Sequence, residues 1–570
     1  MATTLKPVDV AVIGLGATGG VAVLPLARAG LKIAGIEAGT WMDPHRDFHA
    51  DEVFNNIRRQ VTTSPKAQRE IPTVRTGPGE KARPPAAHPM MNAIGGTSIH
   101  YWAQSWRLKA WDFKTRSETL QRYGAAAIPT GTTLEDWPLT YDELAPFYDL
   151  VEDEVGVSGA AGNIGGKLTG RGNPFESPRA KEYPMPPLRG SGFTDHMAET
   201  ARKLGWKPFA PPAAINSQPR KGRSSCVYHG YCGSGGCHVS AKGSTAVTTI
   251  PEAQKTKNLT IFDNAHVTRI ETDGNGRVTG VRYLRNREEF FQPAKVVLLA
   301  GYTYENSRLL LLSKSKRYPK GLSNNHGQVG RHYFGHWNSF VTALFPHDIN
   351  TWYGLPAQGT TCDEWADDNF DHSGMGFLGG SSLHVMTERH PIDAAAMSTF
   401  GRAPGWGSAW KKFVHDNAGR QSNTYIQTNT FPYETMYLDL DDEIADPLGD
   451  PVCRINTGGI RENERRATQY ANTKMEQWFQ AAGAIQVAKT PPFVPGVSTH
   501  AYGGTRMGDN ADTNVVNRWG FSHEAPNLGV LGASVMGTSG ARNPTLTAQA
   551  LAWRTADYLV KNWKSVSSLV

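Results

Sequence analysis

Two side chains near the C-terminal end of the sequence, His500 and Asn543, are of the types needed to oxidise an alcohol. A histidine has an ordinary pKa of about 6.5, so its neutral imidazole can accept a hydroxyl proton at working pH. The carboxamide of Asn543 can hydrogen-bond the substrate oxygen. The pair predicts proton abstraction from an alcohol, whereas a single histidine among 18 is more often a surface or structural residue.

A glycine-rich turn near the N-terminus has the spacing of a dinucleotide-binding turn. Gly14, Gly16 and Gly19 follow a short apolar strand and precede an apolar helix. These glycines permit a tight turn, a close approach of the backbone to a pyrophosphate, and close packing of helix on strand. Glu37 ends the following strand, where a carboxylate can bind ribose hydroxyls. The pattern predicts a bound dinucleotide without distinguishing NAD from FAD.

Two further segments have the composition to contact a cofactor. Residues 94–102 contain adjacent glycines, hydroxyl groups and His100, and can lie against a flat ring system. Asn543, Pro544 and Thr545 open the last strong helix, predicted to run to about residue 560. The partial positive charge at its N-terminus can stabilise the negative charge that a flavin gains on reduction.

The elements that must position these residues form an α/β fold. Strand, glycine turn, helix and strand over residues 10–37 make a βαβ unit in a parallel sheet, and a hairpin around 273–276 and a buried strand over 294–301 belong with it. Segments rich in Trp, Tyr and Pro, with strand-like runs such as 422–427, form a discontinuous α+β substrate domain built on an antiparallel sheet. We expect the nucleotide-binding domain at 1–104, 226–344 and 491–570, and the substrate domain at 105–225 and 345–490.

Composition excludes several classes of protein. At 570 residues the chain exceeds the roughly 250–300 at which one core stops growing, so two joined domains are expected. The net charge of +7 is scattered rather than clustered, which argues against a nucleic-acid partner. No apolar run approaches about 18 residues and the first strand begins almost at once, so we expect neither a transmembrane segment nor a signal peptide.

Three cysteines, Cys226, Cys232 and Cys237, lie close together in a glycine-rich segment. Glycines let several sulfur atoms converge while backbone amides point at them, as an iron–sulfur cluster requires. Three thiolates suit a three-iron cluster, with His229 as a candidate fourth ligand. A zinc site and reduced or paired thiols without metal are the alternatives.

Together these segments resemble the glucose–methanol–choline (GMC) family of FAD-dependent oxidoreductases. The resemblance covers the glycine turn, residues 94–102, Val267, residues 300–312 and 329–331, and the tail from His500. It is greatest for bacterial sugar dehydrogenase flavoprotein subunits of the gluconate 2-dehydrogenase and fructose dehydrogenase type, with pyranose oxidases nearby. The resemblance implies a Rossmann-like FAD-binding domain of p-hydroxybenzoate-hydroxylase-like topology. The cofactor-binding residues it implies are Gly14, Gly16, Thr18, Gly19, Glu37, Gly95, Gly96, Thr97, His100, Trp102, Val267, Ala300, Gly532, Ala533, Asn543, Pro544 and Thr545.

The resemblance also implies a reaction. A secondary hydroxyl of a sugar, sugar acid or glycoside would be oxidised to a ketone, with His500 as the base, Asn543 as its partner and hydride transfer to flavin N5. Many members carry a second histidine where this chain has Asn543. His100 would bond covalently to the flavin 8α-methyl as in pyranose oxidases, or pack near the ring without a bond. A [3Fe-4S] cluster at the three cysteines would relay electrons to a cytochrome or quinone.

The implied partners are a small subunit bearing a twin-arginine signal and a cytochrome c subunit. With them the protein would be exported to the periplasm; a cytoplasmic protein is the alternative. The rival functions are an oxygen-using pyranose or glycoside oxidase acting at C2 or C3, a glycoside 3-dehydrogenase, a flavin lyase without net redox, and a non-enzymatic nucleotide-binding subunit.

Overall fold

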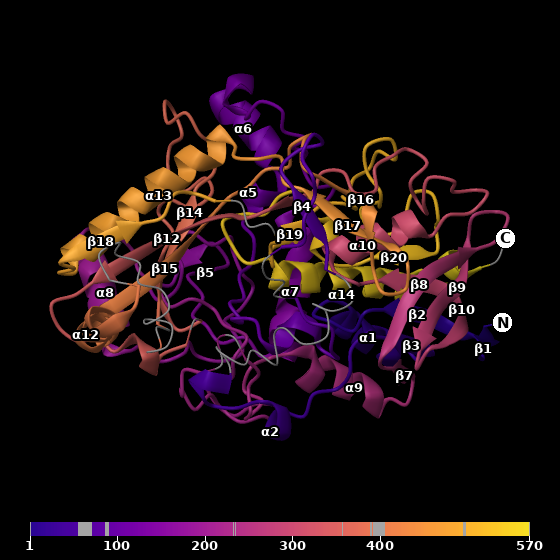
Figure 1. Ribbon diagram of the computed structural model, residues 1–570, viewed down its shortest axis with the longest axis horizontal. Coiled ribbons are helices and arrows are strands. Elements are labelled where there is room, and N and C mark those ends of the chain that lie inside the picture. Colours follow the sequence, from indigo (N-terminus) through magenta and orange to yellow (C-terminus); the bar gives the residue numbers. More distant parts are fainter. Residues whose placement is uncertain are drawn as a thin grey trace.

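The computed structural model describes residues 2–54, 71–85, 90–231, 233, 235–355, 357–387, 390, 405–493 and 497–568. Its two largest sheets lie at opposite ends of the molecule, and most helices pack on these sheets or between them (Figure 1). Both ends of the chain lie beside the sheet that contains the glycine turn (Figure 1).

The larger sheet is the nucleotide-binding half predicted from the sequence. Its first βαβ unit is parallel, and a long central strand continues beyond it to form an antiparallel ladder. The hairpin predicted at 273–276 is confirmed, whereas the strand predicted over 294–301 begins earlier because its first half pairs with that hairpin. In spatial order the strands are β7 (Leu259–Phe262), β3 (Ile33–Ile36), β2 (Val8–Ile13), β10 (Glu288–Leu299), β9 (Val278–Arg285) and β8 (Ala265–Thr272), and β1 (Thr3–Thr4) and β20 (Leu528–Val530) also pair with β10.

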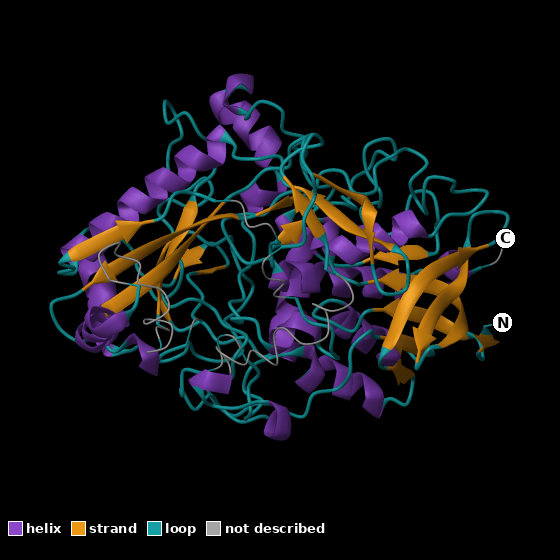
Figure 2. Ribbon diagram, in the orientation of Figure 1, coloured by secondary structure: helices purple, strands orange, loops and turns teal. Residues whose placement is uncertain are grey.

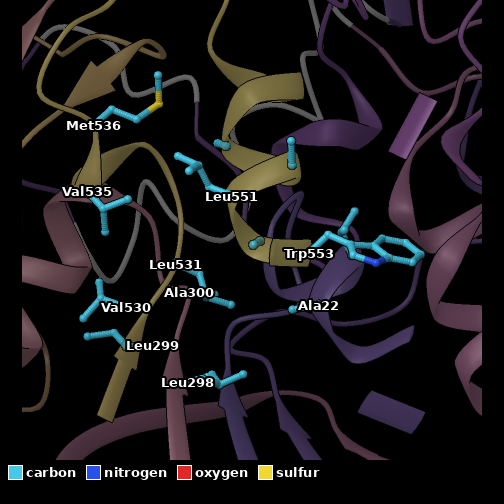
Figure 3. Close-up of a cluster of buried hydrophobic side chains, with 14 of the residues drawn as sticks. Ala22, Leu298, Leu299, Ala300, Val530, Leu531, Val535, Met536, Leu551 and Trp553 are labelled. Carbon is cyan, nitrogen blue, oxygen red and sulfur yellow. The ribbon is translucent and has the colours of Figure 1, made fainter. Parts of the chain in front are cut away.

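Helices α1 (Gly19–Arg28) and α14 (Thr545–Lys561) pack against each other beside this sheet, and α7 (Tyr141–Val155) packs on α14. Figure 3 shows Ala22 of α1 near side chains from the ends of β10 and β20 and from α14. These residues are apolar and almost fully buried, so their burial fixes where the helix N-termini lie. The start and the end of the chain therefore share one core.

The second large sheet is antiparallel throughout, as predicted for the substrate domain. Helices α8 (Gly192–Lys203) and α13 (Glu462–Ala481) pack on it through Trp478 and Phe193, and Figure 2 shows them on its outer side. Its order is β13 (Gly359–Cys362), β14 (Ser381–Met386), β15 (Gln421–Thr428), β12 (Trp337–Leu344) and β18 (Gln486–Lys489). β12 ends just before residue 345 and pairs with strands on the far side of that expected domain boundary.

Short elements connect the two halves. β11 (Phe334–Gly335) pairs with β19 (Ala501–Tyr502), which brings the residues after β11 next to those before β19. A three-stranded sheet packs against α10 (Thr303–Leu312), and its strands in spatial order are β16 (Tyr437–Ala445), β17 (Pro451–Asn456) and β4 (Thr73–Arg75). The remaining elements of note are α9 (Thr249–Lys255), α12 (Gly407–Asn417), the short hairpin β5 (Asn163–Ile164) and β6 (Lys167–Leu168), and the 3-10 helix η2 (Gly96–Ile99).

Candidate active site

The glycine turn has the geometry that its sequence predicts. Gly14 has a φ of +87°, and a Cβ atom there would lie 2.5 Å from the carbonyl oxygen of Ala300. A Cβ atom on Gly19 would lie 2.0 Å from the Gly14 carbonyl oxygen, so this glycine permits the packing of α1 on β2. The backbone of Gly96 crosses the turn so closely that its Cβ atom would lie 2.9 Å from the Cα atom of Gly16. Residues 94–102 therefore lie against the turn.

Glu37 is held beside this turn by two backbone amides. Its carboxylate accepts hydrogen bonds from Leu15 N at 2.8 Å and from Gly39 N at 3.0 Å. The side chain is buried and lines the cavity described next. The acidic residue at the end of the second strand is thus fixed at the wall where a ribose would lie.

One large cavity of about 890 Å³ joins the glycine turn to the substrate sheet. This volume is at the upper end of the range for small-molecule sites. Gly19 and Gly95 do not line the cavity and instead make close backbone packing possible. The predicted residues that do line it are Gly14, Gly16, Thr18, Glu37, Gly96, Thr97, His100, Trp102, Val267, Ala300, His500, Gly532, Ala533, Asn543, Pro544 and Thr545.

The structure brings His500 and Asn543 together at the middle of this cavity. Nδ2 of Asn543, just before α14, lies 3.2 Å from Nε2 of His500, just before β19. The N-terminus of α14 lines the cavity and has no acidic residue in its first turn to offset its partial positive charge. The two ends of the chain that were predicted to meet therefore do so.

A second histidine, which the sequence analysis did not single out, completes a hydrogen-bond chain. His336 is fully buried; its Nε2 lies 3.0 Å from the carbonyl oxygen of Gly540, and its Nδ1 lies 3.1 Å from Nδ1 of His500. A carbonyl oxygen only accepts, so Nε2 of His336 carries the proton and its Nδ1 is an acceptor. His500 must then donate from Nδ1, which leaves its Nε2 unprotonated, facing Asn543.

Burial keeps both imidazoles neutral. It lowers the pKa of His500 to about 4 and, together with the neighbouring His500, places the pKa of His336 well below its ordinary value. His336 stands between β11 and β12 in a segment without any sequence motif. Only the pairing of β11 with β19 places it beside His500, so a single sequence carries no signal of its position.

The wall of the cavity opposite the glycine turn comes from the substrate sheet. Strands β12, β14 and β15 contribute both polar and aromatic side chains to this substrate wall. The rings of Trp102 and Tyr425 meet edge to face with centroids 6.2 Å apart. Nδ1 of His384 lies 2.8 Å from Oγ1 of Thr361, which fixes the orientation of that ring. The members of the substrate wall are Phe340, Ser382, His384, Met386, Tyr425 and Gln427.

The predicted iron–sulfur site is only partly described. Cys226 and Cys237 are half-buried free thiols, and Cys232 lies outside the described residues. Among the described residues no three His, Cys, Asp or Glu side chains are grouped to hold a metal ion. The cluster stays a prediction.

In the described ranges, no helix combines the length and the apolarity that crossing a bilayer demands.

Comparisons with known proteins identify the family. A family model described as GMC oxidoreductase matches residues 432–552, which include His500 and Asn543. The chain is 31% identical to the gluconate 2-dehydrogenase flavoprotein of Pantoea cypripedii, covering 98% of this chain and 94% of that protein. It is 29% identical to the 2-methyl-1,2-propanediol dehydrogenase of Mycolicibacterium austroafricanum (99% and 97% covered) and 26% identical to the fructose dehydrogenase large subunit of Gluconobacter japonicus (98% of each).

Solved structures agree on the fold. A formate oxidase variant of Aspergillus oryzae superimposes with a TM-score of 0.60 over 99% of both chains, at 14% sequence identity. A likeness at this identity supports the α/β architecture, and the curated relatives support the family across the whole chain. The chain therefore belongs to the GMC oxidoreductase family of FAD-dependent oxidoreductases.

Proposed function

We propose that this enzyme oxidises a secondary hydroxyl group of a sugar, sugar acid or glycoside to a ketone. The observation that carries the proposal is the hydrogen-bond chain from His336 through His500 to Asn543, which opens onto a cavity with a polar and aromatic substrate wall. Two of the similar relatives are named for gluconate and fructose, which supports a polyhydroxylated substrate.

FAD fits the side of the cavity that contains the glycine turn. Gly14, Gly16 and Gly96 line this side of the cavity without a side chain, so a pyrophosphate can approach their backbone. Glu37 lies at the end of the neighbouring strand. The N-terminus of α14, which packs beside α1, also faces the cavity. When bound, FAD supplies an acceptor for the hydride that leaves the substrate carbon.

The side chains of this protein handle the proton. Nε2 of His500 takes the hydroxyl proton, because its Nδ1 proton is already committed to His336. Asn543 donates its amide hydrogen to the same substrate oxygen and holds it beside the imidazole. His336 accepts from Nδ1 of His500 throughout, so it fixes the tautomer of the base and steadies the charge that the base gains.

The substrate wall supports recognition of a sugar. Ser382, His384 and Gln427 present hydrogen-bonding groups from adjacent strands, and Trp102 and Tyr425 present aromatic surface. A polyol offers both hydroxyl groups and apolar C–H faces, which match these two kinds of side chain. The reacting carbon would be held between this wall and the flavin.

His100 lines the cavity directly after η2, and we propose that it bonds covalently to the flavin 8α-methyl. The test is to precipitate the holoenzyme with acid and to measure the flavin that stays with the protein. Retained flavin that disappears in His100→Ala supports the bond. Complete release of flavin from the unaltered enzyme rejects it in favour of non-covalent packing.

We further propose that electrons leave to a cytochrome c or quinone acceptor, through a cluster at Cys226, Cys232 and Cys237 where one is present. The partners would be a cytochrome c subunit and a small subunit with a twin-arginine signal, and the location the periplasm. One relative is named as a large subunit, that of fructose dehydrogenase, which supports a multi-subunit complex. Iron analysis of the purified complex tests the cluster, and an oxygen electrode separates this dehydrogenase from a peroxide-forming oxidase.

The function itself is tested by screening sugars, sugar acids and glycosides with a dye acceptor, and by identifying the product by NMR. Anaerobic bleaching of the flavin by a sugar excludes a lyase without net redox. His500→Gln should keep its flavin and lose activity, which excludes a non-enzymatic subunit. Failure of every secondary alcohol to bleach the flavin would reject the proposal.

A further inference from the structure

A buried ion-pair cluster lies directly behind the two residues that are proposed to act on the substrate. Arg542 precedes Asn543 in the chain and is only 2% exposed. Its guanidinium group pairs with Asp367 through Nη1 and with Asp363 through Nη2, and both carboxylates are fully buried. One cation held between two acceptors in a fork geometry is a rigid anchor, because the planar guanidinium fixes the direction of each bond.

The Asp367 carboxylate also holds the neighbouring backbone. Its Oδ1 accepts hydrogen bonds from Ala541 N at 2.9 Å and from Nδ2 of Asn429 at 3.0 Å. Burial raises the pKa of Asp367, but the charges of Arg542 and Lys109, together with the hydrogen bonds from Arg542 and Asn429, outweigh burial and lower the pKa below its ordinary value. The side chain of Asp367, in the substrate domain, thus holds residues 541–542 at two points, the backbone N–H of Ala541 and the guanidinium group of Arg542.

Residues 540–543 form the segment that aligns the catalytic groups. Gly540 supplies the carbonyl oxygen that accepts from Nε2 of His336, and Asn543 donates to Nε2 of His500. Ala541 and Asn543 line the cavity, whereas Arg542 does not. Arg542 can therefore affect the reaction only through the groups that it holds in place.

The same cluster reaches the substrate wall. Oδ1 of Asp363 accepts a hydrogen bond from Oγ of Ser382 at 2.5 Å, and Ser382 lines the cavity from β14. Asn173 holds the other oxygen of Asp363 through Nδ2 at 2.6 Å. Arg542 consequently joins the segment with Asn543 to the strand that would contact the sugar.

A third buried carboxyl group, Asp112, limits the charge of the cluster. Its side chain is fully buried, and Oδ2 accepts from Lys109 N at 2.7 Å. Burial and the nearby charge of Asp367 raise the pKa of Asp112 well above its ordinary value, which favours its neutral form. The ion pairs of Arg542 are made with Asp363 and Asp367.

We propose that Arg542 is a positioning residue: clamped between Asp363 and Asp367, it fixes residues 540–543 so that Asn543 and the His336–His500 pair stay aligned with each other and with the substrate wall. The inference rests on the proposed function for its effect on turnover. Its structural part, the fixed tautomers of the two histidines, does not depend on which alcohol is oxidised.

The first test is Arg542→Lys, which keeps the charge and removes the fork. A misplacement of about 1 Å can cost about 100-fold in rate, so we expect kcat to fall by that order while KM for the sugar identified in the dye screen stays unchanged. The matched control is Arg179→Lys. Arg179 is a fully buried arginine that forks onto Glu152 and does not line the cavity. The proposal is overturned if the two variants, compared at equal flavin content, lose kcat to the same extent.

A second measurement needs no substrate. Imidazole 15N shifts of the histidine-labelled holoenzyme should show a proton on Nε2 of His336 and on Nδ1 of His500. Asp367→Asn removes one charge of the clamp without changing its shape, and should mix the two tautomers. A native enzyme whose His500 carries its proton on Nε2 overturns the proposal even if sugar oxidation is confirmed; fixed tautomers in an enzyme that oxidises no sugar would reject only the proposed function.

Discussion

The hydrogen bond from His500 to His336 should control catalysis, and His336→Leu is the perturbation that isolates it. Leucine fills most of the same buried volume but offers no acceptor to Nδ1–H of His500. A buried donor left without a partner costs about 1–3 kcal/mol. If that cost falls on the aligned state of the base, kcat drops roughly 5- to 150-fold, since each 1.36 kcal/mol is about tenfold in rate.

The assay is the anaerobic reduction of the flavin by the sugar from the dye screen, followed by stopped flow. KM should change little, because His336 does not line the cavity. His336→Asn returns an acceptor near the position of Nδ1 and should recover part of the rate. His196→Leu on α8 is a control for the loss of an imidazole–carbonyl bond alone, since the exposed His196 bonds the carbonyl oxygen of Ala482 away from the site.

The reasoning is refuted if His336→Leu keeps most of its kcat at full flavin content, or if His336→Asn is no faster than the leucine variant. Either result would mean that Nδ1 of His500 does not need this acceptor, and that another group fixes the base.

Three further outcomes follow from the site. Burial lowers the pKa of His500 to about 4, so protonation removes the base only as the pH falls through about 4. A plot of kcat/KM against pH should therefore be flat down to that region. A loss of activity near the ordinary pKa of about 6.5 would show that burial does not lower the pKa of this histidine. Gly96→Ala places a Cβ atom 2.9 Å from the Cα atom of Gly16 at a φ of +52°, and this strain should lower the free energy of unfolding by about 1–3 kcal/mol; an unchanged melting temperature would show that residues 94–102 do not lie against the turn. Gln427→Leu should raise KM for a sugar by about tenfold, the worth of one hydrogen bond, and leave a small apolar secondary alcohol unaffected; equal effects on both would remove Gln427 from recognition.

Sequence reasoning succeeded where a function depends on local backbone geometry. The glycine turn can be predicted because the close contacts between strand and helix leave no room for a side chain at Gly14 and Gly19. The hairpin at 273–276 can be predicted for a similar reason, because its turn residues lie between two segments in which apolar and polar residues alternate. In each case a few neighbouring residues contain the whole signal.

The rest depends on contacts between distant segments. His336 contacts His500 only because β11 pairs with β19, and Arg542 meets Asp363 and Asp367 only because the substrate domain folds back on residues 540–543. A buried histidine or arginine has no periodicity of its own, so one sequence cannot assign it a partner. The sequence also does not identify the residues of the substrate wall. Strand register decides which face of β14 and β15 lines the cavity, and register depends on pairing between distant segments.

The position of β10 has a consequence for how the protein is made. The second half of this strand is held between β2 and β20, and β20 lies about 500 residues after β2 in the sequence. At roughly 5–20 residues per second, translation takes about half a minute or more to join them. Gly14, Ala300 and Asn543 all line the cavity, so its wall is complete only after the segment that follows β20 has been synthesised.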